Sequence, residues 1–185
     1  MKYRVYLRAL EPEDYKKSYK WRNDPEIQDL VGGHKYFVSS ENEKNWVAKN
    51  TYNSDRIVLA ICLKDNDKYI GNVMLQNFDW INRSCSAPFF IGDKSEWGKG
   101  YGTEARMLML DFAFKERGME RISDLVIEGN EASRKLHLKC GYKEEGVMRN
   151  SVFKNGRFQN QIVMGLLKED FIQAKLLFEN KSDHK

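Results

Sequence analysis

The chain has 185 residues, of which 41% are hydrophobic, 12% aromatic and 31% charged, and its formal net charge is +4. This composition is typical of a globular protein and excludes an intrinsically disordered one. Its Lys and Arg residues are dispersed among Asp and Glu rather than gathered into a basic tract, which argues against nucleic acid as a partner.

Cysteine usage and the distribution of apolar residues indicate the compartment. The amino-terminal segment MKYRVYLRAL lacks the apolar stretch of a signal peptide, and nowhere do about 18 apolar residues follow one another. The three cysteines, Cys62, Cys85 and Cys140, are odd in number and widely spaced, so they indicate buried thiols rather than disulfides or a metal site. We therefore expect a cytoplasmic protein, with no metal and no membrane partner.

The first third of the chain predicts one strand and two helices. A short strand is expected over Tyr3–Arg8, and the acidic first turn with Pro12 predicts a helix over Glu11–Trp21. A second helix is expected over Ser40–Lys49. The loop 30–37, LVGGHKYF, contains two glycines, and whether it acts as a mobile lid stays open.

The middle of the chain changes to a strand pattern. The β-branched run IVLAICL and the run IGNVMLQNF flank the polar turn DNDKY, which predicts a hairpin. The next strand is expected over SCSAPFFI. Pro88 lies inside it and cannot donate a hydrogen bond to a neighbouring strand, so we expect a bulge or a local break in pairing there.

The last third alternates helices and strands. Tyr101, Ala105, Leu108, Met109 and Phe112 recur at helical spacing, which predicts a helix of about four turns that ends near Gly118, with one apolar face against a sheet. RISDLVIE then predicts a strand. Asn130 is expected to cap a short helix that reaches Lys139, and Gly141 to end it. The strands VMRNSVF and RFQNQIVMGLL are expected to flank a hairpin turn at Lys154, Asn155 and Gly156.

This order of elements predicts an α+β (mixed α/β) fold rather than a doubly wound one. No repeat, linker or low-complexity block interrupts it. We expect one domain over residues 1–178 and a polar carboxyl-terminal tail over residues 179–185.

The most informative segment is WGKGYGT, from Trp97 to Thr103, which follows the run FFI and opens a predicted helix. Glycines let the backbone approach a ligand closely, and free N–H groups at a helix start favour an anion such as pyrophosphate. Lys99 adds a positive charge at the rim. The segment fits neither a P-loop nor a dinucleotide-binding loop. Taken alone, it is equally compatible with a tight turn between a strand and a helix.

Two motifs give the segment a context. WGKGYGTEA resembles the acyl-CoA loop of the GNAT superfamily of N-acetyltransferases, with the pattern Q/R-x-x-G-x-G/A, and the segment from Asn130 to Tyr142 resembles the family's N-x-x-S/A-x-x-x-Y-x-K-x-G-F. Two motifs at the family's separation are more specific than either alone. LRALEPEDY, WRNDPE and GVMRNSVFKNGRFQNQIVMGLL further resemble the branch that contains ribosomal-protein N-terminal and spermidine acetyltransferases, so the resemblance covers nearly the whole chain.

The resemblance implies a fold and a co-substrate. It implies a single GNAT-like domain whose central, mostly antiparallel, twisted sheet of about seven strands is flanked by helices, and which binds acetyl-CoA. It also implies the binding groups: backbone of Phe90, Ile91 and Gly92 for the pantetheine arm, amides of Trp97, Gly98, Lys99, Gly100, Tyr101, Gly102 and Thr103 for the pyrophosphate, and Asn130 with Ser133 beside the pantetheine.

Acetyl transfer to an amine needs a neutral amine, a polarised thioester carbonyl and a proton for the leaving thiolate. His137 stands where the family has Tyr, and it is the candidate catalytic acid because a histidine can donate a proton near neutral pH. A histidine packed on the helix face is the alternative.

The general base has no evident counterpart. The resemblance implies a Glu on the fourth or fifth strand, but those positions hold Ser86 or Ala87 and Leu125. Two explanations stay open: an amine that arrives deprotonated, or a carboxylate that acts through ordered water, namely Asp14, Asp79 or Glu128.

These features predict an acetyl-CoA-dependent N-acetyltransferase that acts on a primary amine of a small molecule, such as a polyamine or an amino sugar, or of a protein N-terminus. The missing base motivates the alternative, a non-catalytic acetyl-CoA-binding regulatory module. Asn160 resembles the spermidine acetyltransferases, whereas WRNDPE is closer to N-terminal and aminosugar acetyltransferases. The aromatic residues Tyr36, Phe37, Trp46 and Trp80 either line the acceptor pocket or belong to core and rim. The acceptor and the oligomeric state, a homodimer included, stay open.

Overall fold

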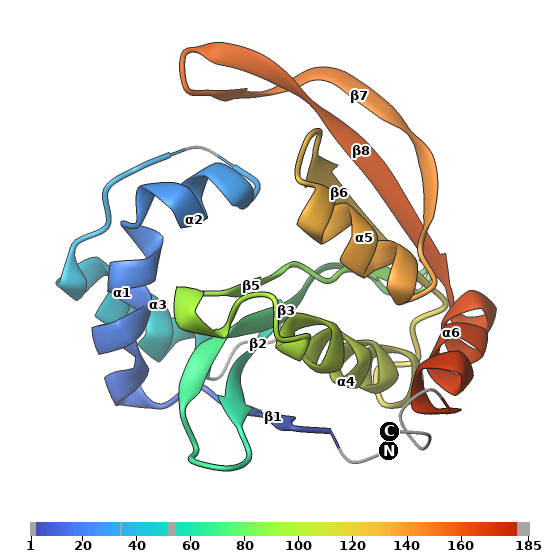
Figure 1. Cartoon of the computed structure of the whole chain (residues 1–185), viewed down its shortest axis with the longest axis horizontal. Coiled ribbons are helices and arrows are strands. Elements are labelled where there is room, and N and C mark those ends of the chain that lie inside the picture. The colour runs from blue at the N-terminus through green and yellow to red at the C-terminus, as the bar shows by residue number, and fades with distance from the viewer. Residues whose placement is uncertain (1–2, 34, 52–54, 181–185) are drawn as a thin grey trace.

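A computed structural model of the chain describes residues 3–33, 35–51 and 55–180 (Figure 1). Its elements in chain order are β1 (Val5–Ala9), a 3-10 turn (Pro12–Asp14), α1 (Tyr15–Arg22), α2 (Pro25–Leu30), α3 (Ser40–Thr51), β2 (Arg56–Leu63), β3 (Tyr69–Asp79), β4 (Ser84–Ser86), β5 (Phe89–Ile91), a second 3-10 turn (Lys94–Glu96), α4 (Tyr101–Lys115), β6 (Arg121–Ile127), α5 (Glu131–Lys139), β7 (Lys143–Lys154), β8 (Arg157–Leu167) and α6 (Lys168–Asn180). The predicted mixed α/β class is confirmed.

One sheet forms the centre of the molecule. Its strands follow the order β1-β2-β3-β4-β6-β8-β7, and β5 pairs with β3 outside this row. Neighbours are antiparallel except β4 and β6, which run parallel over two residue pairs, Ser84 with Arg121 and Cys85 with Ile122. The mostly antiparallel sheet is confirmed. Over the part of the chain that the structure describes, it has eight strands rather than about seven because SCSAPFFI forms two strands.

The break in that segment lies where Pro88 predicted it. Before it, β4 pairs with both β3 and β6, whereas after it β5 pairs with β3 and no pairing within the described residues joins β5 to β6. Beyond Ile122, β6 continues beside β8 alone. We call the facing, unpaired edges of β5 and β6 the strand opening.

Helices cover both faces of the sheet. On one face, Trp21 of α1 packs against Tyr69, with ring centroids 4.8 Å apart, and against Phe90 at 6.3 Å. On the other face, α4 and α5 meet beside β5, because a Cβ at Gly102 would lie 3.2 Å from Leu136 and 3.3 Å from Phe89. Figure 1 shows α4 and α5 in front of the sheet and α1 to α3 at its side.

Helix α4 is buried over a wider arc than the single apolar face that its spacing predicted. Met107, Leu110 and Phe114 are buried as well, because α6 packs on α4 from another side. The rings of Phe114 and Phe171 lie 5.2 Å apart. Helix α6 reaches Asn180, two residues into the predicted tail, and residues 181–185 of that tail lie outside the described part of the chain.

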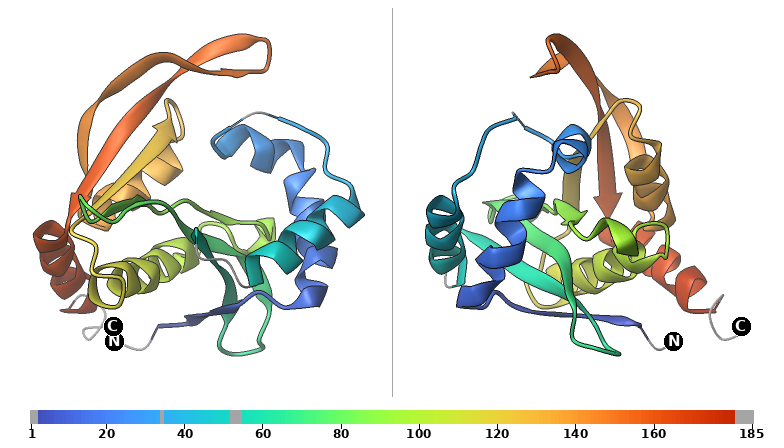
Figure 2. Two further views of the ribbon diagram at one scale, coloured as in Figure 1. Left: turned by 180° about the vertical axis from the view of Figure 1, so that it is seen from behind. Right: turned by 60° about the vertical axis from the view of Figure 1, so that its left-hand side comes forward.

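The hairpin β7–β8 stands out from the rest of the molecule and extends to the side where α2 lies (Figure 2). Its predicted turn is confirmed, since Asn155 and Gly156 both adopt positive φ, +53° and +74°, as a tight two-residue hairpin turn requires. Within the described residues, no helix is long and apolar enough to cross a membrane.

Candidate active site

The glycine loop enters α4 with its amide groups free. Gly98 and Gly100 adopt positive φ, +74° and +88°, and Gly100 is the N-cap residue, which offers no side chain to cap the helix. Trp97 N–H donates to Lys94 C=O and Thr103 N–H to Gly100 C=O. Between them, no partner within the described residues accepts from the N–H groups of residues 98–102. These consecutive amides lie directly before and in the first turn of a helix of 15 residues, whose dipole adds to their attraction for an anion.

The charges at the rim of the loop are already paired. Lys99 Nζ lies 2.8 Å from Glu96, and Lys68 Nζ lies 2.7 Å from the same carboxylate. These two lysines lower the pKa of Glu96. Lys99 therefore contributes a partly neutralised charge, and the backbone N–H groups are the main anion donors. The donor set fits a pyrophosphate.

The free edge of β5 faces the strand opening at two residues. Pro88 C=O accepts from Met74 N–H, and Gly92 N–H donates to Ile70 C=O, so the alternation of an antiparallel ladder turns the N–H and C=O of Phe90 toward β3. Those of Phe89 and Ile91 point to the opposite edge.

Trp97 joins this edge to the glycine loop, since its Nε1–H donates to Ile91 C=O at 2.8 Å. Of the three residues predicted to bind pantetheine, two in β5 and one directly after it, only Ile91 has its N–H at the opening, because the N–H groups of Phe90 and Gly92 face β3. Their binding roles stay predictions.

Asn130 and Ser133 lie together in the first turn of α5. Asn130 Oδ1 accepts from Ser133 N–H at 3.1 Å, which confirms the predicted helix cap, and its Nδ2 donates to Leu30 C=O at 3.0 Å. Both functional ends of the Asn130 side chain are thus engaged within the protein. A direct contact of Asn130 or Ser133 with pantetheine stays a prediction.

His137 is 3% exposed and lies among Phe89, Tyr142 and two charged side chains. Its Nδ1 is 2.7 Å from Ser133 C=O, so Nδ1 must carry the proton that donates to this oxygen. Its Nε2 lies 3.9 Å from Asp124 and has no hydrogen-bond partner within the described residues.

Burial, with Arg106 nearby, lowers the pKa of His137 to about 4. At neutral pH the imidazole is therefore uncharged, with its proton on Nδ1 and an unprotonated Nε2. These surroundings are those of the packed-histidine alternative. The acid role stays a prediction.

A buried polar cluster that the sequence did not predict lies beside His137. Arg106 of α4, 1% exposed, pairs with Asp124 of β6, 7% exposed, and both bind the hydroxyl of Tyr142. The same two charged side chains bind Ala87: Asp124 Oδ1 accepts from its N–H at 2.8 Å, and Arg106 Nη1 donates to its C=O. Burial raises the pKa of Tyr142 well above its usual value, so the phenol stays protonated.

The cluster maintains the strand opening. Ala87 lies where β4 ends and β5 begins to part from β6, and its backbone groups would otherwise need partners in a neighbouring strand. Side chains from α4 and β6 take that place. The signal in the sequence was one Arg and one Asp with apolar neighbours, Arg106 before the run MLML and Asp124 before the run LVI, which indicates burial with a partner but not which partner.

The three carboxylates considered for the general base differ in their surroundings. Asp14 is bound by Arg8 and by Glu11 N–H, and Asp79 caps the turn at Asn82. Glu128, just after β6, is exposed and accepts from Asn160 Nδ2 at 2.9 Å. Within the described residues, no group of three or more His, Cys, Asp or Glu side chains is arranged to hold a metal ion.

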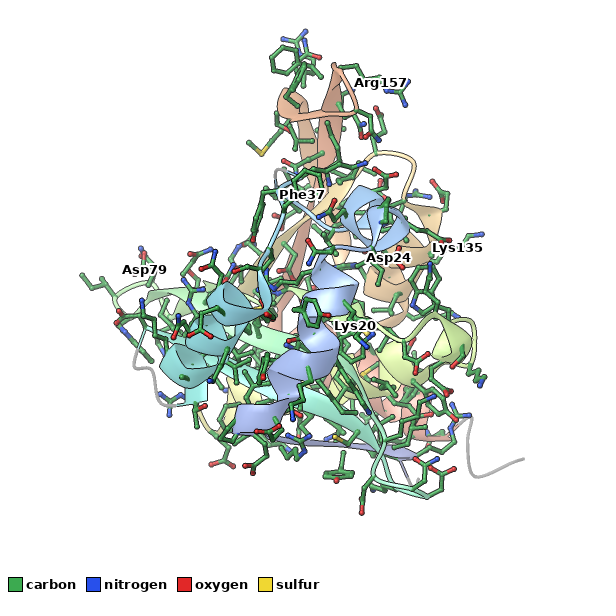
Figure 3. The ribbon with its side chains drawn as sticks, turned by 90° about the vertical axis from the view of Figure 1, so that its left-hand side faces the viewer. Lys20, Asp24, Phe37, Asp79, Lys135 and Arg157 are labelled. Carbon is green, nitrogen blue, oxygen red and sulfur yellow. The ribbon has the colours of Figure 1, made fainter. Side chains whose placement is uncertain are left out.

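The candidate pocket aromatics do not form one group. Arg22 links two of them, because it donates to Tyr36 OH at 3.1 Å and lies 4.5 Å above the ring of Trp46. Phe37 is 98% exposed, beneath the hairpin that carries Arg157 (Figure 3). Trp80 instead stacks on Phe78 at the end of β3. The loop 30–37 that carries Tyr36 and Phe37 includes His34, which lies outside the described residues.

Comparison with known proteins gives a consistent result. Residues 4–143 match the family model of the acetyltransferase (GNAT) domain. The chain is 27% identical to spermidine N(1)-acetyltransferase of Vibrio cholerae, over 93% of this chain and 98% of that one. It is 25% identical to the SPbeta prophage-derived uncharacterized N-acetyltransferase YokL of Bacillus subtilis, over 89% and 90%.

The fold agrees with this result. A crystal structure of the Vibrio cholerae spermidine N-acetyltransferase in complex with CoA and spermine superimposes with a TM-score of 0.84, at 24% identity, over 91% of this chain and 98% of that one. The family match, the free amides before α4 and the parted strands lead to one conclusion: this chain belongs to the GNAT family of acetyltransferases and transfers the acetyl group of acetyl-CoA to an amine.

Proposed function

We propose that the chain acetylates a primary amine of a small molecule, with polyamines and amino sugars as the acceptor classes. The observation that carries the proposal is the run of free N–H groups at residues 98–102 beside the strand opening, which together offer a pyrophosphate site and an edge for an extended amide chain. Relatives from Vibrio cholerae and Escherichia coli are named spermidine N(1)-acetyltransferases, which supports the acceptor class.

Contacts between α2 and the hairpin favour a small acceptor over a protein N-terminus. Lys154 Nζ, at the hairpin tip, donates to Gln28 C=O at 2.7 Å and to Val31 C=O. Asn155 Nδ2 donates to Asp29 at 2.8 Å. With the bond from Asn130 to Leu30, these contacts form a bridge from α2 to the hairpin tip and to the start of α5. A small amine can reach the strand opening beneath this bridge more readily than a folded protein can.

The glycine loop and the edge of β5 would position acetyl-CoA for the reaction. In the transfer, the amine nitrogen forms a bond to the acetyl carbon, the carbon–sulfur bond breaks, the nitrogen loses one proton and the thiolate gains one. The loop amides would hold the pyrophosphate and the β5 edge would align the arm, so that the thioester lies at the end of the opening. Glu128, the most exposed of the three carboxylates, is proposed to accept the amine proton through water.

The acid is tested separately. If His137 protonates the thiolate, His137→Ala should lower kcat by roughly 10²-fold with little change in acetyl-CoA affinity, and His137→Tyr should recover much of the rate. If His137 is only packed, the variants lose activity only as far as they unfold, and kcat per folded molecule equals that of the parental protein. The uncharged imidazole, with its proton on Nδ1, supports the second outcome.

The function itself is tested by thiol release from acetyl-CoA with a panel of polyamines, amino sugars, aminoglycosides and N-terminal peptides. We expect turnover with the small amines and an increase in melting temperature with acetyl-CoA alone, because a ligand that binds only the folded state stabilises it. Turnover confined to peptides would contradict the small-molecule acceptor.

A cytoplasmic location is part of the proposal and is supported by the three unpaired, buried thiols.

A further inference from the structure

Arg4, directly before β1, links the start of the sheet to the glycine loop. Its backbone N–H and its Nε each donate to a carboxylate oxygen of Glu104 at 2.7 Å. Its Nη2 donates to Lys99 C=O at 2.8 Å, and its guanidinium lies 4.7 Å above the ring of Tyr101. One side chain thus holds the loop, the first turn of α4 and the strand together.

Glu104 anchors this side chain. It lies in the first turn of α4 with its side chain 3% exposed, whereas that of Arg4 is 55% exposed. A buried carboxylate needs hydrogen bonds and a counter-charge, and the planar guanidinium supplies both in one fixed orientation. Because Glu104 holds the Nε side of the fork, Nη2 remains directed at the loop.

The bond to Lys99 sets the orientation of one peptide group in the loop. In a trans peptide the C=O and the following N–H point in opposite directions, so a Lys99 C=O bound to Arg4 turns Gly100 N–H away from Arg4. Gly100 has a φ of +88°, and a Cβ there would lie 3.2 Å from Arg4 Nη2. The guanidinium therefore occupies the side of Gly100 opposite to its free N–H.

We propose that Arg4 is a positioning residue for acetyl-CoA: together with Glu104 it fixes the Lys99–Gly100 peptide so that the loop amides converge on the pyrophosphate. This inference rests on the proposed function, because it requires the loop to bind that group. Arg4 acts through the backbone it holds, and it contributes little as a free positive charge, since Glu104 neutralises it.

The first test compares two acetyl donors, acetyl-CoA and S-acetylpantetheine, which lacks the pyrophosphate. Arg4→Met should raise KM for acetyl-CoA about tenfold, the effect of losing one hydrogen bond from a charged donor, and leave kcat unchanged. Turnover of S-acetylpantetheine should not change. Arg4→Lys should behave like Arg4→Met, because one ammonium cannot reproduce the fork.

The control is Arg121→Met, which breaks another arginine–glutamate pair, with Glu145, away from the loop. It should alter neither donor's kinetics. An equal loss on both donors in Arg4→Met would show a general structural role and overturn the proposal, as would full activity of Arg4→Lys.

Glu104→Gln separates positioning from direct attraction and carries the test if Arg4→Met does not fold. Positioning predicts weaker acetyl-CoA binding, because Arg4 loses its anchor. Direct attraction of the phosphates by Arg4 predicts tighter binding, because a nearby negative charge is removed, and that result would overturn the proposal. A parental protein that binds no acetyl-CoA contradicts the proposed function instead, whereas parental binding with unaffected Arg4 and Glu104 variants contradicts only this inference.

Discussion

The glycine loop and the buried polar cluster lie at opposite ends of the strand opening and are built in different ways. The loop is made of consecutive backbone groups, and its N–H donors occupy residues 98–102. The cluster is made of side chains from distant positions, namely Arg106, Asp124 and Tyr142, which meet only in the folded chain beside His137. The first binds through backbone groups, whose conformation a few side chains hold, whereas the second consists of the side chains themselves.

The largest expected effect tests the cluster. Asp124→Leu leaves the Arg106 charge in the interior without its carboxylate, and Ala87 N–H and Tyr142 OH without their acceptor. We expect a loss of about 3–5 kcal/mol in the free energy of unfolding, measured by urea titration. Glu145→Leu, which breaks the half-exposed pair with Arg121, should cost less than about 1 kcal/mol. Similar losses in the two variants would show that burial of the ion pair is unimportant.

The next effect is a pH dependence of stability. His137 has a pKa of about 4 in the folded protein and about 6.5 when unfolded, so between these values the unfolded chain binds one proton more. The contribution of the uncharged His137 to the free energy of unfolding is fully present above about pH 6.5. It is lost as the pH falls toward 4, by up to about 3 kcal/mol. Unfolding titrations at pH 7, 5.5 and 4.5 should therefore show a steeper decline for the parental protein than for His137→Gln. Parallel declines would mean that His137 titrates normally.

The loop is tested by a backbone change. Gly100→Val forces a β-branched residue to a φ of +88° and places its side chain against Arg4, so acetyl-CoA affinity should fall about 100-fold, or about 2.7 kcal/mol. Gly118→Val is the matched control, because Gly118 also has a positive φ, +65°, and a Cβ added there would lie 3.2 Å from Arg83 Nη2. Calorimetry with acetyl-CoA should show near-parental affinity for the control. Equal weakening in both variants would point to general strain.

The smallest effect lies at the junction of loop and strand. Trp97→Phe keeps an aromatic ring but removes the N–H that donates to Ile91 C=O. A loss of about 1 kcal/mol in acetyl-CoA affinity, roughly fivefold, is expected from one neutral hydrogen bond. Affinity unchanged within error would show that the loop holds its position without this bond.

Local signals predicted most of the fold. Pro88 marked the break between β4 and β5, Asn130 and Gly141 marked the ends of α5, and Asn155–Gly156 marked the hairpin turn, because each acts through its own backbone geometry. Helix α6 and the wide burial of α4 were missed, since they depend on how the two helices pack.

The site follows the same division. The glycine loop was predicted from contiguous residues, whereas Arg106 and Asp124 are 18 residues apart in the sequence and meet because α4 packs beside β6. Arg4 is a further case, because its partner Glu104 is 100 residues away. Contacts over such separations leave no local pattern.

The support of Ala87 by side chains has a kinetic consequence. Because Asp124 and Arg106 satisfy its N–H and C=O, no interstrand hydrogen bond has to break before a ligand enters between β5 and β6. We therefore expect diffusional encounter with the loop, rather than a slow opening of the sheet, to set the association rate of acetyl-CoA. Hydrogen–deuterium exchange at the Ala87 amide should be slow without ligand and slower still with acetyl-CoA, because that proton is released only when the surrounding core unfolds and the ligand stabilises the folded state.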